Sequence, residues 1–496
     1  MGWEKQKEEE AKEETGKRRE EKDKKKKQKK GKMMEINKVA EEWEIWDEEE
    51  EAVKSEVEAK KMVPKKFHQW IKVFRKKQSE RMLMRKVWDH AIEVKKGFVP
   101  RKGKIYLLSR EEREEVREFI KEQLRKEYIQ PSKSLQIAPV FFVRKKDGKK
   151  WMVQDYRYLN KWTIKNNYLL PLISDVLENI GTKKVFMKMD LRWGYNNVRI
   201  KEGDEWKAVF TMPEGSFEPM VMFFGLTNLP ATFQAMMNEL LRDLINTGKV
   251  AVFIDDVIVG TETEKGHDEL VVEVIRRLKA NDLYVKPEKY KWKVREVEFL
   301  EVVIGPEGIK MEEEKVKKVM EWPTQKCVKD VQKFLRLANY YRQFIEGFAL
   351  IARPLHDMVK KDKKWDWTVR QEKAFRELKE WFTKELVLAA PDLDKKLRVE
   401  VDASDYATGG VLSMEGEDGK WRLVAFLSKS LNETERNYEI HDKKMLAIIR
   451  GLEAWRHLLE GVQFKFEIWM DYKNLEYFIK AQKLNRRQAR WALYLS

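Results

Sequence analysis

Residues 250–259 read Val-Ala-Val-Phe-Ile-Asp-Asp-Val-Ile-Val, so two adjacent acids, Asp255 and Asp256, lie between two apolar runs. Apolar runs of this length around a polar pair predict a strand, a tight turn and a second strand. The turn would place two carboxylates at the head of a hydrophobic hairpin. Neighbouring like charges beside a core are unfavourable unless solvent or a cation screens them. The pattern therefore fits a solvent-facing turn and a divalent-metal site equally well.

A third acid favours the metal site. Residues 185–191, Val-Phe-Met-Lys-Met-Asp-Leu, form another apolar strand pattern that reaches its acid at Asp190. The chain between Asp190 and Asp255 is long enough for helices that cross one face of a shared sheet. Carboxylates at the ends of two strands can hold two Mg²⁺ ions about 4 Å apart, which activates a hydroxyl and stabilises a pyrophosphate leaving group. The polymerisation of nucleotides requires that chemistry.

The composition sets the class of protein. The chain has 496 residues, with 102 Lys and Arg against 85 Asp and Glu, which gives a net charge of +17. Its apolar content, 42% of residues, suffices for several folded domains, and the positive charge favours a polyanionic partner. The single cysteine, Cys327, excludes intramolecular disulfides and sites built from several cysteines. No stretch reaches the roughly 18 apolar residues of a membrane span, and the charged start is unlike a signal peptide. We therefore expect a soluble intracellular protein, in a cytoplasmic particle or in the nucleus.

The N-terminal part of the chain changes character twice. Residues 1–62 carry a lysine-rich run at 24–32 and an acidic run at 48–51, which indicates a solvated, disordered tail. A nuclear-import or nucleic-acid role for these lysines is the alternative interpretation. In residues 63–130, the capping box Ser109-Arg110-Glu111-Glu112 precedes apolar residues at helical spacing, which predicts a helix that Pro131 stops.

Strand and helix patterns alternate in the rest of the chain. Residues 140–143 and 151–153 predict a hairpin with a basic Asp-Gly tip, and strands alternate with helices between 184 and 303, notably the helices at 232–244 and 269–279. We expect residues 305–393 to be helical, most clearly at 328–344 and 369–382. Strand patterns return from Leu397. A helix from about 437 to 459 follows, with a buried face, and the last apolar alternation is at 464–470. The buried helix face is predicted from Ile440, Leu446, Ile449 and Leu452, and the alternation from Phe464, Phe466, Ile468 and Met470.

Several ordered motifs together resemble the reverse transcriptase of Ty3/gypsy-type long-terminal-repeat retrotransposons. They include Lys188-Met-Asp-Leu-Arg-Trp-Gly-Tyr195, Phe223-Phe-Gly-Leu-Thr-Asn-Leu-Pro-Ala-Thr-Phe-Gln234 and Phe253-Ile-Asp-Asp256. The resemblance continues through Asn281–Lys289 and Phe334–Tyr341, and it reaches the ribonuclease H segment at 401–404 and 473–478. It covers roughly Val63 to Ser496.

The resemblance implies a multidomain α+β fold. We expect a charged tail at 1–62, a helical extension at 63–130, fingers and palm at 131–304, thumb and connection helices at 305–393, and a C-terminally truncated ribonuclease H-like α/β domain at 394–496. The implied function is RNA-directed DNA polymerisation with an attached ribonuclease H. The implied partners are an RNA template, a DNA primer, their hybrid and deoxynucleoside triphosphates. The oligomeric state stays open.

The resemblance also implies roles for single residues. Asp190, Asp255 and Asp256 match the palm metal ligands, and Asp402 and Asp471 match metal-binding acids of ribonuclease H, with two Mg²⁺ or Mn²⁺ ions in each active site. Two residues match nucleotide contacts: Tyr195 is the aromatic that excludes a ribose 2′-hydroxyl, and Lys145 on the hairpin tip touches the triphosphate.

The chain departs from the family pattern at three residues. Trp151 stands where the family carries an arginine that binds the triphosphate, and Glu301 replaces a glycine in the turn that holds the primer end. Lys444 replaces the metal-binding glutamate of ribonuclease H. The chain also stops before the last acid of that domain, and it shows neither a protease Asp-Ser/Thr-Gly triplet nor a His/Cys zinc cluster.

Two hypotheses therefore remain. The first is a retrotransposon reverse transcriptase with ribonuclease H whose activity is impaired. The second is a catalytically inactive remnant that only binds nucleic acid. An RNA-copying RNA polymerase is disfavoured, because Tyr195 and the ribonuclease H segment both fit DNA synthesis.

Overall fold

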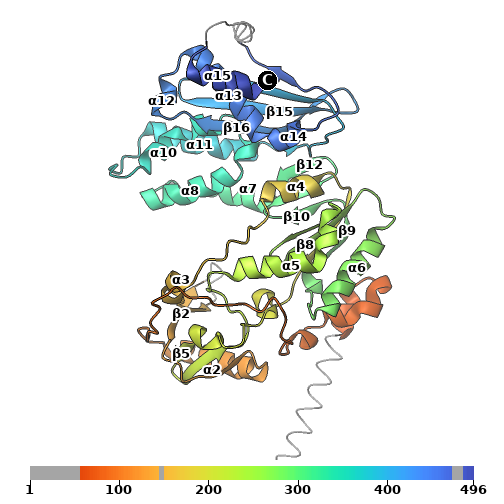
Figure 1. The fold of residues 1–496 in the computed structure, drawn as a ribbon, viewed down its shortest axis with the longest axis vertical. Coiled ribbons are helices and arrows are strands. Elements are labelled where there is room, and N and C mark those ends of the chain that lie inside the picture. Colours follow the sequence, from red (N-terminus) through yellow and green to blue (C-terminus); the bar gives the residue numbers. More distant parts are fainter. Residues whose placement is uncertain (1–55, 145–149, 472–483, 496) are drawn as a thin grey trace, which may run out of the picture.

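A computed structural model describes residues 56–144, 150–471 and 484–495, and it shows a mixed helix and sheet protein built around four sheets (Figure 1). The sheets follow one another along the long axis of the molecule. The tail expected at 1–62 falls almost wholly outside the described residues. No helix in the described ranges is long and apolar enough to cross a membrane.

The first sheet contains the predicted hairpin and has the strand order β1-β6-β5-β2-β3. Residues 140–144 of β2 pair with β3, as predicted, and the tip at 145–149 lies outside the described residues. Helix α2 starts with the predicted capping box at Ser109 but ends at Arg125, before Pro131. The reason is that residues 129–131 form a strand paired with β6. The elements are β1 (Ile129–Pro131), β2 (Ala138–Arg144), β3 (Lys150–Gln154), β5 (Phe210–Met212), β6 (Gly215–Pro219), α2 (Arg110–Arg125) and α3 (Arg157–Trp162).

The second sheet carries the predicted acids and has the order β7-β8-β4-β9. Both predicted helices of this region exist, as α5 and α6, and they pack beside the sheet (Figure 1). Their apolar sides are buried in one core with the strands, for example at Phe233, Val257 and Val274. The elements are β4 (Val185–Asp190), β7 (Val250–Phe253), β8 (Asp256–Thr261), β9 (Lys291–Val294), α5 (Leu229–Asn246) and α6 (His267–Ala280).

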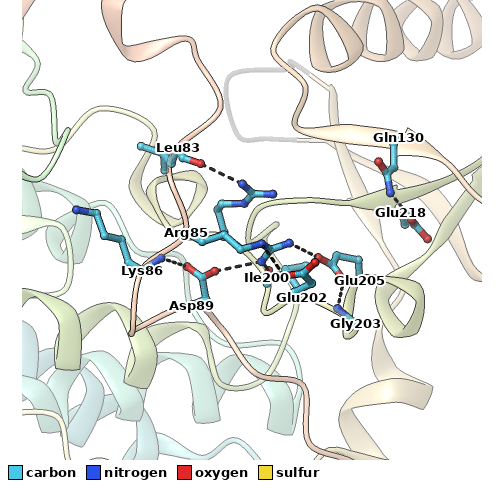
Figure 2. A network of polar contacts seen from close by, with 11 residues as sticks. Leu83, Arg85, Lys86, Asp89, Gln130, Ile200, Glu202, Gly203, Glu205 and Glu218 are labelled. Carbon is cyan, nitrogen blue, oxygen red and sulfur yellow. Dashed lines mark hydrogen bonds and ion pairs between the residues drawn. The ribbon is translucent and has the colours of Figure 1, made fainter.

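A polar network joins residues 83–89, which precede α2, to residues 199–205 (Figure 2). Arg85 donates to the carboxylates of Asp89 and Glu205, over 3.1 and 2.7 Å, and to the carbonyl of Ile200 over 2.8 Å. Arg199 donates back to the carbonyl of Leu83 over 3.2 Å. Residues 83–89 are thereby fixed against residues 199–205, which lie between β4 and β5.

The third sheet corrects the expectation that residues 305–393 are helical throughout. Its strands β10 (Val297–Phe299), β11 (Val302–Gly305), β12 (Gly308–Met311) and β13 (Val387–Leu388) lie in that order. A Cβ at Gly308 would lie 2.1 Å from the carbonyl oxygen of Leu388, so the close approach of β13 requires glycine there.

Helices cover this sheet and continue the chain. The predicted helix at 328–344 ends at Tyr340 and continues as a short 3₁₀ turn, whereas the helix predicted at 369–382 is α11. The helices are α4 (Ile173–Gly181), α7 (Glu313–Met320), α8 (Val328–Tyr340), α9 (Phe348–Ile351), α10 (Arg353–Met358) and α11 (Val369–Thr383).

The fourth sheet has the order β16-β15-β14-β17, and β17 is parallel to β14. Helix α13 packs against it so closely that a Cβ at Gly451 would lie 3.2 Å from Val401. Among the described residues, the elements are β14 (Leu397–Ala403), β15 (Ala407–Glu415), β16 (Trp421–Ser430), β17 (Glu467–Trp469), α12 (Glu433–Arg436), α13 (Ile440–Ala454), α14 (Arg456–Leu459) and α15 (Arg486–Leu495).

Two details of this region were predicted wrongly. The single helix expected from 437 to 459 is broken into α13 and α14, and Ile440, in the first turn of α13, is 47% exposed rather than buried. The alternation at 464–470 yields only a three-residue strand, with Ile468 exposed, because β17 lies at the edge of the described sheet.

Candidate active sites

Asp190 and Asp256 lie directly opposite each other on neighbouring strands. Asp190 ends β4, Asp256 begins β8, and the two residues are register partners of this antiparallel pair. Directly opposed residues project from the same face of a sheet. Asp255 lies in the turn just before β8, where its carbonyl accepts a hydrogen bond from the amide of Leu191 over 3.2 Å. The structure thus brings the three predicted acids to one end of two strands.

Two lysines hold the carboxylate of Asp190. Lys286 Nζ lies 2.6 Å from Oδ1, and Lys289 Nζ lies 3.0 Å from Oδ2. The burial of Asp190, which is 9% exposed, would raise its pKa, but the hydrogen bonds and charges of the two ammonium groups outweigh burial and lower the pKa. Sequence reasoning missed both lysines as site residues, although the segment that contains them carries part of the family resemblance.

The negative charge of Asp256 is balanced less completely by nearby lysines than that of Asp190. Burial raises its pKa, and the negative charges of Asp255 and Asp190 act in the same direction. Lys188 opposes them from 3.4 Å. Within the described ranges, no group of three or more His, Cys, Asp or Glu side chains converges closely enough to hold a metal ion. The three acids are therefore neighbours at one strand end, with the oxygens of Asp190 turned to lysines.

Tyr195 lies beside these acids. It follows Trp193 and Gly194, which both have positive φ angles, of 65° and 43°. A Cβ at Gly194 would lie 3.7 Å from Oδ2 of Asp255. Burial raises the pKa of Tyr195 to about 12, and the charge of Asp255 adds to the effect. The Tyr195 ring is fixed by two edge-on contacts, with ring centroids 5.1 Å from Phe224 and 5.7 Å from Phe233.

In the fourth sheet, Asp402 and Asp471 share one lysine. Asp402 is near the end of β14 and Asp471 follows β17, and Lys444 on α13 donates hydrogen bonds to both, over 2.7 Å to Asp471. Burial would lower the pKa of Lys444, but the two carboxylates outweigh burial and raise the pKa. The hydrogen bond from Lys444 lowers the pKa of Asp471.

The acids that precede Lys444 on the same stretch of chain are directed elsewhere. Asp442 is buried and accepts hydrogen bonds from Arg487 and, over 2.9 Å, from Gln488. Glu439 is exposed, and its Oε2 lies 3.5 Å from Nδ1 of His441. Neither acid therefore replaces a carboxylate at position 444.

Two family models match the chain. The model described as reverse transcriptase (RNA-dependent DNA polymerase) matches residues 143–304, and the model of the RNase H-like domain found in reverse transcriptase matches residues 392–496. The Tf2-3 and Tf2-4 transposon polyproteins of Schizosaccharomyces pombe are each 36% identical over 378 residues, which is 76% of this chain. The chain thus carries a domain of the reverse transcriptase family and an RNase H-like domain, in a stretch similar to these transposon polyproteins. It spans 28% of the length of these polyproteins.

The chain also shares its fold with solved structures. The foamy viral protease-reverse transcriptase in complex with dsDNA superposes with a TM-score of 0.74 over 88% of this chain and 92% of that chain. The same viral protein in complex with an RNA/DNA hybrid gives a TM-score of 0.71, over 88% of this chain and 59% of that one. At 22% identity these similarities show the fold, a reverse transcriptase with an RNase H-like domain.

Trp151 is linked to Tyr195 through one aromatic ring. It lies on β3 opposite Val143, and it is 44% exposed. Its ring meets Phe224 edge-on at 5.7 Å, and Phe224 in turn meets Tyr195. The indole is therefore linked to the Tyr195 ring through Phe224. Lys145, expected near the same place, lies outside the described residues.

Glu301 occupies a backbone position suited to glycine. Leu300 and Glu301 form the turn between β10 and β11, with φ angles of 49° and 63°. Residues other than glycine rarely adopt this left-handed conformation. Tyr341 donates to the Glu301 carbonyl over 2.8 Å, and Lys315 Nζ lies 2.5 Å from its carboxylate. The left-handed backbone at this position explains why a glycine suits it, which the sequence pattern alone did not reveal.

Proposed function

We propose that this chain copies RNA into DNA by extending a DNA primer on an RNA template. The observation that carries the proposal is the register pairing of Asp190 with Asp256, next to the turn that holds Asp255. This pairing brings together carboxylates from segments far apart in sequence, at one end of the second sheet. Apolar residues of the same strands are buried in the hydrophobic core. Such a cluster serves no packing purpose, since it crowds negative charge.

The donor set of these acids suits Mg²⁺ or Mn²⁺. Asp190, Asp255 and Asp256 would hold the ions, because hard divalent cations prefer carboxylate oxygens. Burial raises the pKa of Asp256, and the negative charges of Asp255 and Asp190 add to that effect, so a bound cation would favour its ionised form. Lys286 and Lys289 already place ammonium groups on Asp190, so that carboxylate binds cationic groups in the structure itself. When bound, two such ions would activate the primer hydroxyl and neutralise the triphosphate.

The substrate assignment rests on Tyr195. Its ring is fixed between Phe224 and Phe233 beside Asp255, so it cannot move away from a sugar that enters there. A rigid ring excludes a 2′-hydroxyl by occupying its place, which selects deoxynucleoside triphosphates. Lys145 is our candidate for a contact with the triphosphate, because an ammonium group neutralises phosphate.

The proposed partners are an RNA template, a DNA primer and the hybrid that they form. The net charge of +17 favours a polyanion, and the foamy viral proteins of the same fold were solved with dsDNA and with an RNA/DNA hybrid. Binding through phosphate neutralisation weakens steeply as salt increases. A hybrid affinity that does not change with salt would contradict this mode of binding.

We infer that the polymerase activity is impaired. Trp151 offers one neutral donor where the family has a bidentate guanidinium, and Glu301 adds a negative side chain to the turn expected to hold the primer end. These two residues also support the second candidate, a chain that binds nucleic acid without turnover.

Primer extension decides between the two candidates. The full chain is incubated with a labelled DNA primer on an RNA template, all four deoxynucleotides and Mg²⁺ or Mn²⁺, and hybrid binding is measured in parallel. Slow extension that requires the metal supports the polymerase. Salt-sensitive binding without any extension supports the inactive remnant.

A further inference from the structure

In the RNase H-like domain one lysine, Lys444, contacts two acids at once. In the site of Asp190, by contrast, Lys286 and Lys289 contact that one acid. We propose that the ammonium of Lys444 takes the place of a divalent metal ion between Asp402 and Asp471, so that the domain binds no catalytic metal there and leaves the RNA strand of a hybrid uncut. The inference rests on the proposed function only in naming the hybrid as the nucleic acid concerned.

The contacts of Lys444 carry the proposal. Its ammonium donates to both carboxylates, one from β14 and one from the end of β17, which are neighbouring parallel strands. A single positive charge thus joins the two strand ends at the point where the family places a metal. An ammonium group has three donors and can bridge two carboxylates in this way.

The burial of Lys444 fixes it in this position. Its side chain is only 8% exposed, whereas the side chains of Asp402 and Asp471 are 68% and 75% exposed. The lysine lies on α13, whose neighbouring residues Met445 and Ala447 belong to the core. The ammonium therefore emerges from the buried side of the helix and meets two acids that face outward.

Among the described residues, neither Asp442 nor Asp405 restores the missing ligand. Asp442 is held by Arg487 and Gln488, and Asp405 is held by Lys443 over 3.0 Å. A divalent ion that joined Asp402 to Asp471 would have to displace the Lys444 ammonium or lie against a like charge. Both are unfavourable, because removing one partner of a close charge pair leaves the other charge uncompensated.

A cleft beside the two acids defines the competing possibility. Asp402 and Asp471 line a cavity of about 810 Å³ together with Glu346 and Glu400, and no lysine or arginine is among the described residues that line it. An ion could approach from that side and use only the outward oxygens. Metal binding by the parent chain that depends on Asp402 would therefore overturn the proposal.

The test measures metal binding directly, independently of polymerisation. All samples are the full chain with Asp255→Asn and Asp256→Asn, so that the palm acids do not contribute. Free Mn²⁺ is followed by its electron paramagnetic resonance signal, and the thermal midpoint is recorded with Mn²⁺ and with a chelator. The variants are Lys444→Glu, Lys444→Gln, Asp402→Asn and Lys443→Glu.

Lys443→Glu is the matched control. Lys443 has the same side-chain exposure, 8%, and also pairs with one acid of this domain, but it lies outside the Asp402 and Asp471 pair. Its reversal alters the local charge equally without removing the bridging ammonium. Circular dichroism confirms that each variant is folded, and Lys444→Gln removes the ammonium without adding a negative charge if Lys444→Glu does not fold.

We expect the background chain, Asp402→Asn and Lys443→Glu to bind equally little Mn²⁺ and to show no shift of the midpoint on adding it. Lys444→Glu should bind Mn²⁺ at least about tenfold more tightly, the scale on which one residue changes metal affinity, and its midpoint should rise with Mn²⁺. Lys444→Gln should fall between them. Mn²⁺ binding by the background chain that Asp402→Asn abolishes, or equal binding in Lys443→Glu and Lys444→Glu, would overturn the proposal.

The activity arm uses a hybrid labelled on its RNA strand, with the palm acids intact. The proposal expects no metal-dependent cleavage by the parent chain, whether or not that chain extends primers. Failure of primer extension with no Mn²⁺ site near Lys444 would refute the proposed function alone. RNA cleavage by the parent that Asp402→Asn abolishes would refute the present inference alone.

Discussion

Lys286 Nζ lies 2.6 Å from Oδ1 of Asp190, so the acid at the end of β4 has a fixed cationic partner from a segment 96 residues away. This contact holds the carboxylate ionised although it is largely buried. It also means that the proposed active site balances its negative charge partly with lysines of the chain itself.

Removing this partner should shift the pH dependence of primer extension. Without Lys286 the pKa of Asp190 rises, because burial is then opposed by Lys289 alone. In Lys286→Met, the acidic limb of the rate profile should therefore move to higher pH. Lys291→Met is the control, since Lys291 pairs with Glu298 on the neighbouring part of the chain. An unchanged profile in Lys286→Met would show that Asp190 does not govern the acidic limb.

His90 should make the stability of the protein depend on pH. Burial lowers its pKa to about 4, against an ordinary 6.5, while the charge of Asp204 opposes the effect. The unfolded chain therefore binds this proton more readily than the folded chain. The stabilisation is complete above pH 6.5 and is lost as the pH falls toward 4.

The measurement compares the parent with His90→Gln by urea unfolding at pH 7 and pH 5. Between pH 7 and pH 5, the protonation of His90 should lower the free energy of unfolding of the parent by about 2 kcal/mol, at 1.36 kcal/mol per pKa unit. The glutamine can still bond to Thr232 Oγ1, which lies 2.9 Å from His90 Nδ1, but it does not titrate. Equal losses in both proteins would contradict the assignment.

Glu301→Gly should stabilise the turn between β10 and β11. The left-handed conformation of Glu301 costs roughly 1 kcal/mol relative to glycine, and the lost contact with Lys315 is exposed and worth less. We expect a gain of about 0.5 to 1 kcal/mol in the free energy of unfolding. Glu301→Ala, which keeps a Cβ, should give no gain, and stabilisation by both variants would point to charge rather than backbone conformation.

Trp151→Arg together with Glu301→Gly should raise primer extension more than either change alone. Both the triphosphate and the primer end must be placed correctly in one transition state, and each misplacement can cost about 100-fold. Single-nucleotide extension rates of the parent, both single variants and the double variant test this. If the double variant is no faster than the parent, the defect lies elsewhere.

Local sequence patterns were sufficient for the hairpin with Asp255 and Asp256, because strand and turn signals lie within ten residues. They did not reveal Lys286 and Lys289 at Asp190, since a contact over 96 residues leaves no local periodicity. The strands β12 and β13 were missed because they span only four and two residues, too short for a strand pattern to stand out beside the helix patterns of this region. The conformation of Glu301 was likewise not predicted, because it belongs to a two-residue turn whose carbonyls accept hydrogen bonds from Tyr340 and Tyr341, about 40 residues away.

We expect Asp190, Asp255 and Asp256 to form a metal-dependent polymerase site. The most direct test compares the extension of a DNA primer by one deoxynucleotide on an RNA template, in Mg²⁺ and in Mn²⁺, by the parent and by Asp255→Asn. Asp418→Asn, which changes an exposed carboxyl in the turn before β16, serves as the control. We predict that Asp255→Asn abolishes whatever extension the parent and Asp418→Asn share, while its binding of the hybrid is retained. Extension by Asp255→Asn at the rate of the parent would contradict the claim.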